Sequence, residues 1–373
     1  MKIVHLITCI DLGGAENMVF NLCEYAKNNQ PEDELVIYEI HSSNTAYSRQ
    51  KKQELRSRGV TFKTIGNRYK YISLLVAPFV FLFLLRKEKP SIVHAHTDLP
   101  DFVLAMTLRM MSRPAFQIFR TIHNTELWST HSLAGKLTEA SFHDDTIIAV
   151  SAAAAKAYQH IRNRYQLKAT DKQYMIYNGV PLPAQEPHPF QLDPERINIL
   201  FAGRLELQKG IDLLLEVLTE LPEEWQSKFS FHIAGDGSFR KQVEELVKTR
   251  QHIHYYPTVI NLSNKLYPFR YVLMPSRFEG LGLLSVEASL AGIPVAACRV
   301  AGLEETLPHE WPLWAETPAT GDLFQLLQKI YANDAAYEQL QERSAEWVKE
   351  RFPLDKMGKE YFNLYHSFQK SNG

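Results

Sequence analysis

The sequence has few cysteines and no excess of charge of either sign. Its 373 residues include three cysteines, Cys9, Cys23 and Cys298, with no Cys-x-x-Cys pair. So sparse and odd a set argues against a disulfide framework or a structural zinc site, and it favours a reducing compartment, so we expect a cytoplasmic protein. The formal net charge of −1 argues against a nucleic-acid-binding protein that depends on bulk positive charge.

Long hydrophobic runs are also missing. The chain starts with Met1 and Lys2 and continues into a short β-rich run, so we expect no signal peptide. The longest uncharged stretch is residues 71–85, and it contains Pro78. As a helix it would be ~22 Å long, against a bilayer core of ~30 Å. We therefore expect no membrane-spanning helix.

Three common ligand-binding motifs are absent from the sequence. It has no Gly-x-Gly-x-x-Gly, since the run from Gly280 to Ser285 fails at its last position, and no Gly-x-x-x-x-Gly-Lys-Ser/Thr. A dinucleotide-dependent oxidoreductase or a P-loop NTPase would lack its main signature. There is also no Asp-x-Asp to hold a metal against a diphosphate. We expect an activity without a metal or a cofactor.

Short β-branched runs alternate with longer amphipathic stretches along the chain. This pattern predicts parallel sheets covered by helices on both faces. The expected strands are residues 3–7, 35–40, 91–95, 116–122 and 146–150, then 197–202, 229–234, 271–274 and 295–297; the expected helices include 15–27, 74–85, 211–221 and 239–249. The alternation restarts after residues 181–189, which hold four prolines and favour a stiff linker. We therefore expect two doubly wound domains.

Ligands of open parallel sheets bind where strands end and helices begin. Gly13 and Gly14 follow the first strand and allow a close approach of the backbone to an anion. In the second half, Arg204 and Lys209 follow a strand and precede a helix. A guanidinium fork and an ammonium group together suit a diphosphate.

Two further loops at strand ends carry candidate residues. Gly235 lies in the loop Ile233-Ala-Gly-Asp-Gly237. Glu279 lies in a loop before the next helix, and Glu287 lies near the start of that helix. Gly282 between these carboxylates, with Gly280, frees backbone amides to point outward.

In this order and spacing, the motifs resemble those of the retaining glycosyltransferases of family 4, which have the GT-B fold. The resemblance covers the whole chain. The segments that carry it are Asp11-Leu-Gly-Gly-Ala-Glu16, Val93-His-Ala-His96, Thr121-Ile-His-Asn124, Ala149-Val-Ser151, Tyr177-Asn-Gly-Val180, Gly203-Arg204 with Lys209-Gly210, and the run from Glu279 to Glu287 followed by Ala291-Gly-Ile-Pro-Val295. The fold that the resemblance implies is α/β, with two Rossmann-like domains facing each other across a cleft.

The resemblance implies a domain for each substrate. Residues 1–182 would bind the acceptor, residues 183–352 would bind a nucleotide diphosphate-sugar of the UDP or GDP type, and a helix in residues 353–373 would pack back on the first domain. In the donor half, Arg204 and Lys209 would stabilise the leaving diphosphate, aided by the amides of Gly282 and Leu283. Gly235 would belong to the same donor site.

The resemblance also implies roles for the remaining site residues. Glu287 would bind the ribose hydroxyls, and Glu279 would contact the donor sugar near its transferring carbon. Gly13 and Gly14 would close on the diphosphate from the other domain. His96 and His123 would line the sugar or acceptor side.

The expected activity is transfer of a hexose or hexosamine to a hydroxyl of a glycan or lipid-linked acceptor, with retention of configuration. The biological setting that the family suggests is bacterial cell-envelope polysaccharide or lipopolysaccharide synthesis. Two alternatives stay open: a nucleotide-sugar epimerase of GT-B architecture, and a non-catalytic nucleotide-sugar-binding protein. The base, the sugar and the linkage do not follow from the sequence.

Residues 72–85 have two interpretations. They are apolar almost all round, and Arg68 and Lys70 precede them, while Arg86, Lys87 and Lys89 follow. Residues 1–180 hold 22 basic and 16 acidic residues, a net of +6, which leaves 19 basic and 26 acidic residues, a net of −7, for the rest. The segment is either a helix buried against the sheet or a helix that lies on an anionic membrane, where the enzyme would be peripheral on the inner face.

Overall fold

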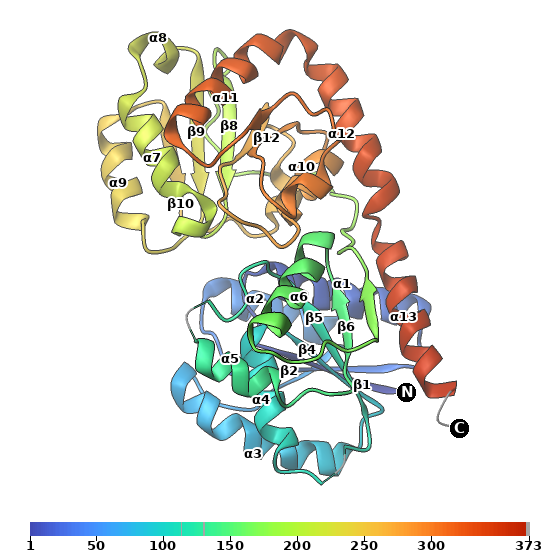
Figure 1. Ribbon diagram of the computed structural model, residues 1–373. Helices are drawn as coiled ribbons and strands as arrows, with labels where there is room; N and C mark the ends of the chain where they lie inside the picture. Colours follow the sequence, from blue (N-terminus) through green and yellow to red (C-terminus); the bar gives the residue numbers. More distant parts are fainter. Residues whose placement is uncertain (113, 130, 371–373) are drawn as a thin grey trace. The chain divides into compact units, whose positions relative to one another are not determined.

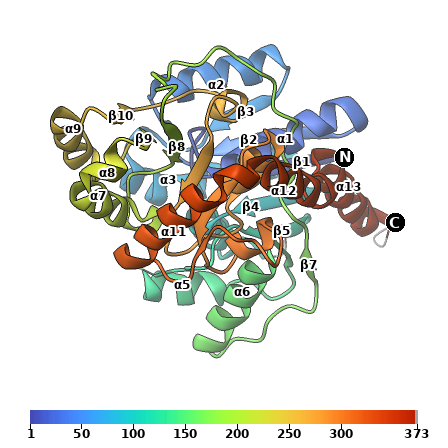
Figure 2. The same cartoon turned by 90° about the horizontal axis from the view of Figure 1, so that it is seen from above.

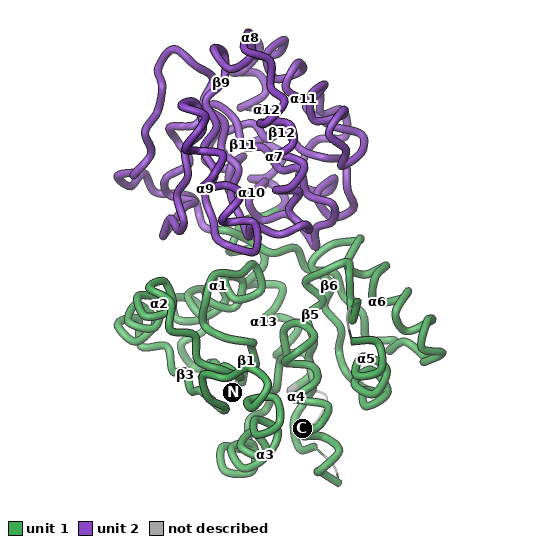
Figure 3. Tube along the Cα trace, turned by 90° about the vertical axis from the view of Figure 1, so that its left-hand side faces the viewer, with its two compact units in different colours: residues 1–180, 352–373 green, residues 181–351 purple. Residues whose placement is uncertain are grey.

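The chain folds into two compact units. The computed structural model describes residues 1–112, 114–129 and 131–370 (Figure 1). Unit 1 comprises Met1–Val180 and Phe352–Gly373, and unit 2 comprises Pro181–Arg351 (Figure 3). These limits lie within two residues of the boundaries expected at 182/183 and 352/353, and residues 371–373 of the third expected segment lie outside the described part. Which unit binds which substrate stays a prediction.

Unit 1 is built on a seven-stranded parallel sheet with the order β3-β2-β1-β4-β5-β6-β7. Its central strands are almost wholly buried, as expected of a sheet that is covered on both faces. The strands are β1 (Lys2–Ile7), β2 (Glu34–Glu39), β3 (Thr61–Thr64), β4 (Ile92–His96), β5 (Gln117–Ile122), β6 (Thr146–Ala149) and β7 (Gln173–Met175).

Helices cover both faces of this sheet. The apolar residues of α1 and α13 pack on one face, and those of α3 and α4 pack on the other. Helix α13 lies against α1. Gly358 of α13 allows this close approach, because a Cβ at this position would overlap the ring of Tyr25. The helices are α1 (Gly14–Asn29), α2 (Ala46–Ser57), α3 (Lys70–Glu88), α4 (Asp98–Leu108), α5 (Ser132–Glu139), α6 (Ala152–Arg164) and α13 (Leu354–Lys370).

Unit 2 repeats the design with a six-stranded parallel sheet, ordered β10-β9-β8-β11-β12-β13. Helices α7 and α9 lie side by side (Figures 1 and 2). The strands are β8 (Ile197–Ala202), β9 (Phe229–Ala234), β10 (Ile253–Tyr256), β11 (Tyr271–Met274), β12 (Val295–Cys298) and β13 (Trp314–Ala315). The helices are α7 (Ile211–Glu220), α8 (Glu223–Gln226), α9 (Arg240–Thr249), α10 (Leu283–Leu290), α11 (Thr320–Asn333) and α12 (Tyr337–Arg351), with short 3-10 turns η1 (Leu207–Lys209), η2 (Leu262–Lys265), η3 (Leu303–Thr306) and η4 (Asp334–Ala336).

The expected fold class is confirmed. In both units, helical crossovers connect the central strand to the parallel strands beside it. Each unit is therefore a Rossmann-like domain. Of the helices in the described part of the chain, none is long and apolar enough to cross a bilayer.

Candidate active site

The loops at the carboxyl ends of β8 and β9 in unit 2 are packed backbone against backbone. Gly203 and Gly235 have φ values of 148° and 147°, a region that side chains rarely tolerate. A Cβ at Gly235 would overlap the carbonyl oxygen of Gly203. This close approach alone requires glycine at position 235, so the expected contact of Gly235 with a donor stays a prediction.

Lys209 and Glu279 form the central ion pair of unit 2. The Nζ of Lys209 lies 2.6 Å from Oε1 of Glu279, and the Ser276 hydroxyl donates a hydrogen bond of 2.8 Å to the same oxygen. Glu279 is only 5% exposed. Gly210, with φ of 69°, brings the loop after β8 against the carbonyl of Pro275 after β11. The two loops therefore place an ammonium group and a carboxylate together; their expected roles toward a diphosphate and a sugar stay predictions.

Arg204 lies in the loop after β8, five residues before Lys209, and keeps an exposed guanidinium. In the described part of the chain it makes one side-chain hydrogen bond, 2.6 Å to Oε1 of Gln208. Gln208 in turn donates to the carbonyl of Phe278, at 3.3 Å. Arg277, in the loop after β11, donates two hydrogen bonds of 2.7 and 2.6 Å to the carboxylate of Asp212. This bracing leaves most donors of Arg204 directed to solvent and available to an anion.

Helix α10 begins at Leu283, four residues after Glu279; Gly282 precedes it and Glu287 lies within it. Gly282, the residue before the helix, has a left-handed backbone conformation with φ of 77°. Desolvation raises the pKa of Glu287 to about 7. Its carboxyl group has no hydrogen bond or ion pair within residues 1–112, 114–129 and 131–370. A desolvated carboxyl group without a partner is suited to accept hydrogen bonds from hydroxyls of a ligand.

Unit 1 holds a chain of three hydrogen-bonded histidines. His5 Nδ1 lies 3.0 Å from His96 Nε2, and His96 Nδ1 lies 3.2 Å from His123 Nε2. Strand β4 pairs with β1 on one side and with β5 on the other. The register of these pairs brings the three histidine side chains to one face of the sheet. Desolvation lowers the pKa of His5 and of His123 to about 3, and that of His96 well below its usual value. All three imidazoles are therefore neutral at pH 7.

Neutrality fixes the direction of the hydrogen bonds. His5 Nε2 is buried and has no partner, and a buried N–H without an acceptor is costlier than a bare acceptor nitrogen. His5 therefore donates from Nδ1 to His96, and His96 donates from Nδ1 to His123. Since Nε2 of His123 is then the acceptor, its proton is on Nδ1. His96 is 1% exposed, and its hydrogen bond to Nε2 of His123 orients the His123 ring.

His5, His94 and His96 are close enough to hold a metal ion, with ligand atoms within 4.8 Å of one another. Five of their six ring nitrogens are instead hydrogen-bonded within the protein, and only His5 Nε2 has no partner among the described residues. His94 bonds to the hydroxyls of Tyr365, at 2.6 Å, and Thr121, at 2.7 Å. The donor set is thus that of a structural hydrogen-bonded array which connects α13 to the sheet.

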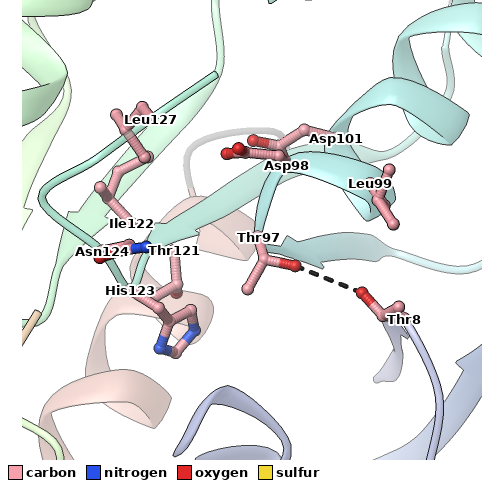
Figure 4. Close-up of a pocket in the computed structure, with 10 residues that line it drawn as sticks. All are labelled: Thr8, Thr97, Asp98, Leu99, Asp101, Thr121, Ile122, His123, Asn124 and Leu127. Carbon is pink, nitrogen blue, oxygen red and sulfur yellow. Dashed lines mark hydrogen bonds between the residues drawn. The ribbon is translucent and has the colours of Figure 1, made fainter. Parts of the chain in front are cut away.

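His123 lines a pocket of about 170 Å³ at the carboxyl ends of β4 and β5 (Figure 4). A hydrogen bond of 3.4 Å between the hydroxyls of Thr8 and Thr97 closes one side. The lining carries hydroxyl, carboxyl, amide and imidazole groups around a few apolar side chains, from Thr8, Thr97, Asp98, Leu99, Asp101, Thr121, Ile122, His123, Asn124 and Leu127. Such a lining suits a small ligand rich in hydroxyls.

A buried cluster of charges lies under this pocket. Arg120 is fully buried and bonds to Asp101 at 2.8 Å, Glu139 at 2.6 Å and Asp145 at 3.0 Å. Arg162 adds a second guanidinium, 3.4 Å from Glu139. Three carboxyl groups thus share two positive charges, which leaves one negative charge in excess if all three are ionised.

The pocket carboxyls hold protons more readily than usual because of this excess and their burial. Desolvation, opposed in part by Arg120, raises the pKa of Asp101 to about 7. Desolvation likewise raises the pKa of Asp98 to about 6. The Oδ1 of Asp101 is buried without a partner. It is therefore an unused hydrogen-bonding group at the pocket wall.

The backbone around the pocket is strained at two residues. Thr97 has φ of 78° and Trp128 has φ of 54°, and non-glycine residues in this region cost about 1–3 kcal/mol each. Trp128 uses this conformation to donate its N–H to Asp98, at 3.1 Å. Strain of this kind is concentrated at ligand-binding sites.

Gly13 and Gly14 lie at the start of α1 in unit 1. Gly13 precedes the helix with φ of −178°, an extended conformation that any residue adopts. A Cβ there would overlap the carboxylate of Glu16. The expected contact of these glycines with a diphosphate stays a prediction.

The sequence pattern did not reveal the acidic part of the unit 1 pocket. Asp98, Asp101 and Arg120 did not stand out, although Asp98 and Asp101 closely follow His96 at the end of a strand. Carboxylates in the first turn of a helix are common for electrostatic reasons alone. Their partner Arg120 comes from the next strand, so only the tertiary fold shows that they form a cluster.

The sequence matches the patterns of two protein families. Residues 12–183 match Glycosyltransferase Family 4, and residues 184–347 match Glycosyl transferases group 1. An uncharacterised 41.2 kDa protein in the cps region of Klebsiella pneumoniae is 27% identical over 330 residues, 82% of this chain and 83% of that protein. A human phosphatidylinositol N-acetylglucosaminyltransferase polypeptide is 26% identical over 348 residues, 86% of this chain and 66% of that protein.

Solved structures share the architecture. Anabaena HepE in complex with UDP-glucose has a TM-score of 0.78 at 16% identity, with 98% of this chain and 100% of that chain covered. At this identity the likeness concerns the fold.

Proposed function

Because this chain belongs to the family 4 glycosyltransferases of the GT-B fold, we propose that it transfers a hexose or hexosamine from a nucleotide diphosphate-sugar to a hydroxyl group, with retention of anomeric configuration. The observation that carries the donor assignment is the Lys209–Glu279 pair beside the exposed guanidinium of Arg204, at the carboxyl ends of two central strands. These groups offer a diphosphate two positive charges and the sugar a buried carboxylate.

In the proposed reaction the bond between the anomeric carbon and the diphosphate oxygen breaks while the acceptor oxygen attacks from the same face. The proton of the acceptor hydroxyl passes to the departing phosphate oxygen, so the products are a nucleoside diphosphate and a glycoside. Lys209 and Arg204 stabilise the negative charge on the diphosphate as it leaves. Gly282 and Leu283 present backbone amides to it, and Glu287 accepts hydrogen bonds from the ribose.

We assign the acceptor to the pocket of unit 1. Its hydroxyl, carboxyl and amide groups match a sugar, and the Nδ1–H of His123 is the donor that the histidine chain directs to it. Since His123 is neutral and its pKa is about 3, it orients the acceptor rather than removing its proton. Asp98 and Asp101 serve as hydrogen-bonding groups for the acceptor hydroxyls.

The cps-region relative supports a role in cell-surface polysaccharide synthesis, and the lipid named in the human relative supports a lipid-linked acceptor. We propose a glycan or lipid-linked glycan acceptor on these grounds. HepE was solved with UDP-glucose, which supports a nucleotide diphosphate-sugar donor of the UDP or GDP type. Location on the cytoplasmic side stays a prediction.

Incubation with UDP- and GDP-sugars, without acceptor, tests the reaction class. A transferase should release nucleoside diphosphate slowly by hydrolysis, and acceptor should accelerate the release. Interconversion of sugars without release would support the epimerase, and binding without turnover would support the non-catalytic alternative. Proton NMR of the glycoside determines whether configuration is retained.

Removal of divalent metal is expected to leave turnover unchanged. The charges of Lys209 and Arg204 neutralise the diphosphate in this proposal, and the sequence has no Asp-x-Asp. The measurement is the initial rate with and without EDTA. Complete inactivation that manganese or magnesium reverses would contradict the metal-independent mechanism.

The affinity for the donor is expected to fall below neutral pH. Ribose hydroxyls bind the ionised form of Glu287, whose pKa in the free protein is about 7. As pH falls through this value the carboxyl group is protonated, so kcat/KM for the donor should drop up to about tenfold per pH unit. The Glu287→Gln variant should lose this dependence, while Glu342→Gln, on the exposed side of α12, should keep it. An unchanged profile in Glu287→Gln would remove Glu287 from the donor site.

A further inference from the structure

One side of α3 is apolar and faces solvent. We call it the free face of α3; its residues are Ile72, Leu75, Val76, Phe79 and Phe83, between 43% and 75% exposed. At 100° per residue these positions fall within a narrow stripe along the helix. In Figures 1 and 3, α3 lies at the outer surface of unit 1. A contiguous exposed stripe of this kind marks an interaction surface.

The other side of α3 is firmly packed. Ala77, Phe81 and Leu85 are buried against the sheet and α4. The Thr107 hydroxyl of α4 donates to the carbonyl of Pro78, at 3.3 Å. The helix is therefore held in place by one side, and its free face is a fixed feature of the folded unit. The buried side agrees with the first interpretation of this segment, and contact of the exposed side with a membrane stays a prediction.

Basic residues stand at both ends of the free face. Arg68 and Arg86 continue its stripe in either direction, and Lys70, Lys87 and Lys89 lie beside them. All five are exposed, and none forms an ion pair within the described residues. The one acidic residue of α3, Glu88, pairs with Lys2, at 3.0 Å, and with Lys63. The face thus presents positive charge without a carboxylate to offset it.

Residues 49–58, in α2 and directly after it, hold five basic side chains, of which three are paired with carboxylates. Lys52 pairs with Glu39 at 2.6 Å, Lys51 with Glu54 at 3.1 Å, and Arg58 with Glu24 at 2.5 Å. These cations are used within unit 1. Arg49 and Arg56 form no ion pair among the described residues, so two cations of this segment stay uncompensated, against five at the ends of α3.

We propose that the free face of α3 docks unit 1 on an anionic lipid bilayer. Phe79, Phe83 and Leu75 enter the boundary between headgroups and acyl chains, while the long side chains of Arg68 and Arg86 reach the lipid phosphates at either end. The helix lies in the plane of the bilayer, since one side is fixed to the protein. Docking would bring the acceptor site close to lipid-linked glycans, but it does not depend on the proposed transferase activity.

A second copy of the chain fits this face less well. If two α3 helices met along their free faces, parallel or antiparallel, basic ends would oppose basic ends. No carboxylate on the face would offset the repulsion, and like charges across an interface are unfavourable. Anionic lipid instead complements both the apolar stripe and its basic ends.

Co-sedimentation with vesicles tests the proposal on the full chain without donor or acceptor. Vesicles of phosphatidylcholine with about one-third phosphatidylglycerol should bind the protein at low salt, and binding should weaken as salt screens the basic ends. Pure phosphatidylcholine should bind far less. The double variant Arg86→Gln/Lys87→Gln should bind about 25-fold more weakly, at about fivefold for each charge.

Matched variants separate this surface from general effects. Leu75→Ser/Phe79→Ser should abolish binding, whereas Leu133→Ser should not, although Leu133 of α5 is 75% exposed like Leu75. Lys241→Gln, on α9 of unit 2, is the control for charge. Circular dichroism and melting temperature should be unchanged in all of these, because the substituted side chains are exposed.

Equal binding to neutral and anionic vesicles, or full binding by Leu75→Ser/Phe79→Ser, would overturn the proposal. So would a dimer in sedimentation velocity that this double variant dissociates, with no vesicle binding. Since vesicle binding and sugar transfer are measured separately, failure of one leaves the other standing.

Discussion

Replacing Lys209 by methionine is expected to lower turnover at saturating donor about a hundredfold, which is ~3 kcal/mol of transition-state stabilisation. The Lys209→Met substitution keeps the aliphatic stem and removes the ammonium charge. That charge lies 2.6 Å from Glu279 in the free protein, and in the proposed reaction it meets the leaving diphosphate. Arg204→Met should have a similar effect. Initial rates across donor concentrations separate kcat from KM.

Loss of the Lys209–Glu279 ion pair also lowers the stability of the fold, so control variants must separate this effect from the effect on turnover. Glu279 is 5% exposed, so Lys209→Met leaves a buried carboxylate with Ser276 as a remaining partner, and the variant should melt at a lower temperature. Lys265→Met breaks the pair with Glu186, 3.1 Å apart in the same unit, and should leave turnover unchanged. Arg204→Met breaks no ion pair among the described residues. If both Lys209→Met and Arg204→Met kept turnover within about threefold, the diphosphate assignment would be wrong.

Replacing Arg120 by methionine is expected to destabilise unit 1 by about 3–5 kcal/mol. The guanidinium is fully buried and holds Asp101, Glu139 and Asp145. Its removal leaves three buried carboxyl groups, with Arg162 as the remaining buried cation of the cluster. Urea unfolding followed by circular dichroism measures the loss. The matched control is Lys172→Met, which breaks a pair with the neighbouring Asp144, 85% exposed, and should cost at most about 1 kcal/mol.

The pH dependence of this loss has a defined sign. Burial tends to raise the pKa of Glu139, but the charge and hydrogen bonds of Arg120 outweigh it, so the pKa is lowered. A lowered carboxyl pKa stabilises the fold above the unfolded value of about 4.5, and the stabilisation disappears as pH falls through the folded value. The difference between the native chain and Arg120→Met should therefore be largest near neutral pH and smaller near pH 4. A difference that grows on acidification would contradict the role of these ion pairs.

The central strands of both sheets could be predicted because they are nearly continuous apolar runs. The sequence pattern marked β1, β4, β8 and β11 to within about two residues. It missed β3, β7, β10 and β13, which are the four edge strands. An edge strand pairs on one side and is partly exposed, so it lacks the buried run that identifies a central strand. Its pairing is decided by the neighbour, not by its own residues.

The side on which a strand residue lies could also be predicted in part. Alternation along β4 placed His94 and Ala95 on opposite faces, and His94 is buried against Tyr365 of α13. The partner comes from a helix 271 residues further along the chain. No local pattern indicates such a contact. The chain from His5 through His96 to His123 likewise requires the strand order β1-β4-β5.

The sequence by itself indicated the fold class and the family, and it marked Arg204, Lys209 and Glu279 as candidate donor residues, because each of these depends on residue type and spacing along the chain. The tertiary structure decided what depends on separate elements meeting. It showed that Lys209 pairs with Glu279, that Asp101 lies over Arg120, and that α3 is covered on one side only. The composition of α3 is apolar all round, so its buried side is set by which residues the sheet and α4 can reach. Its remaining side faces solvent for the same reason.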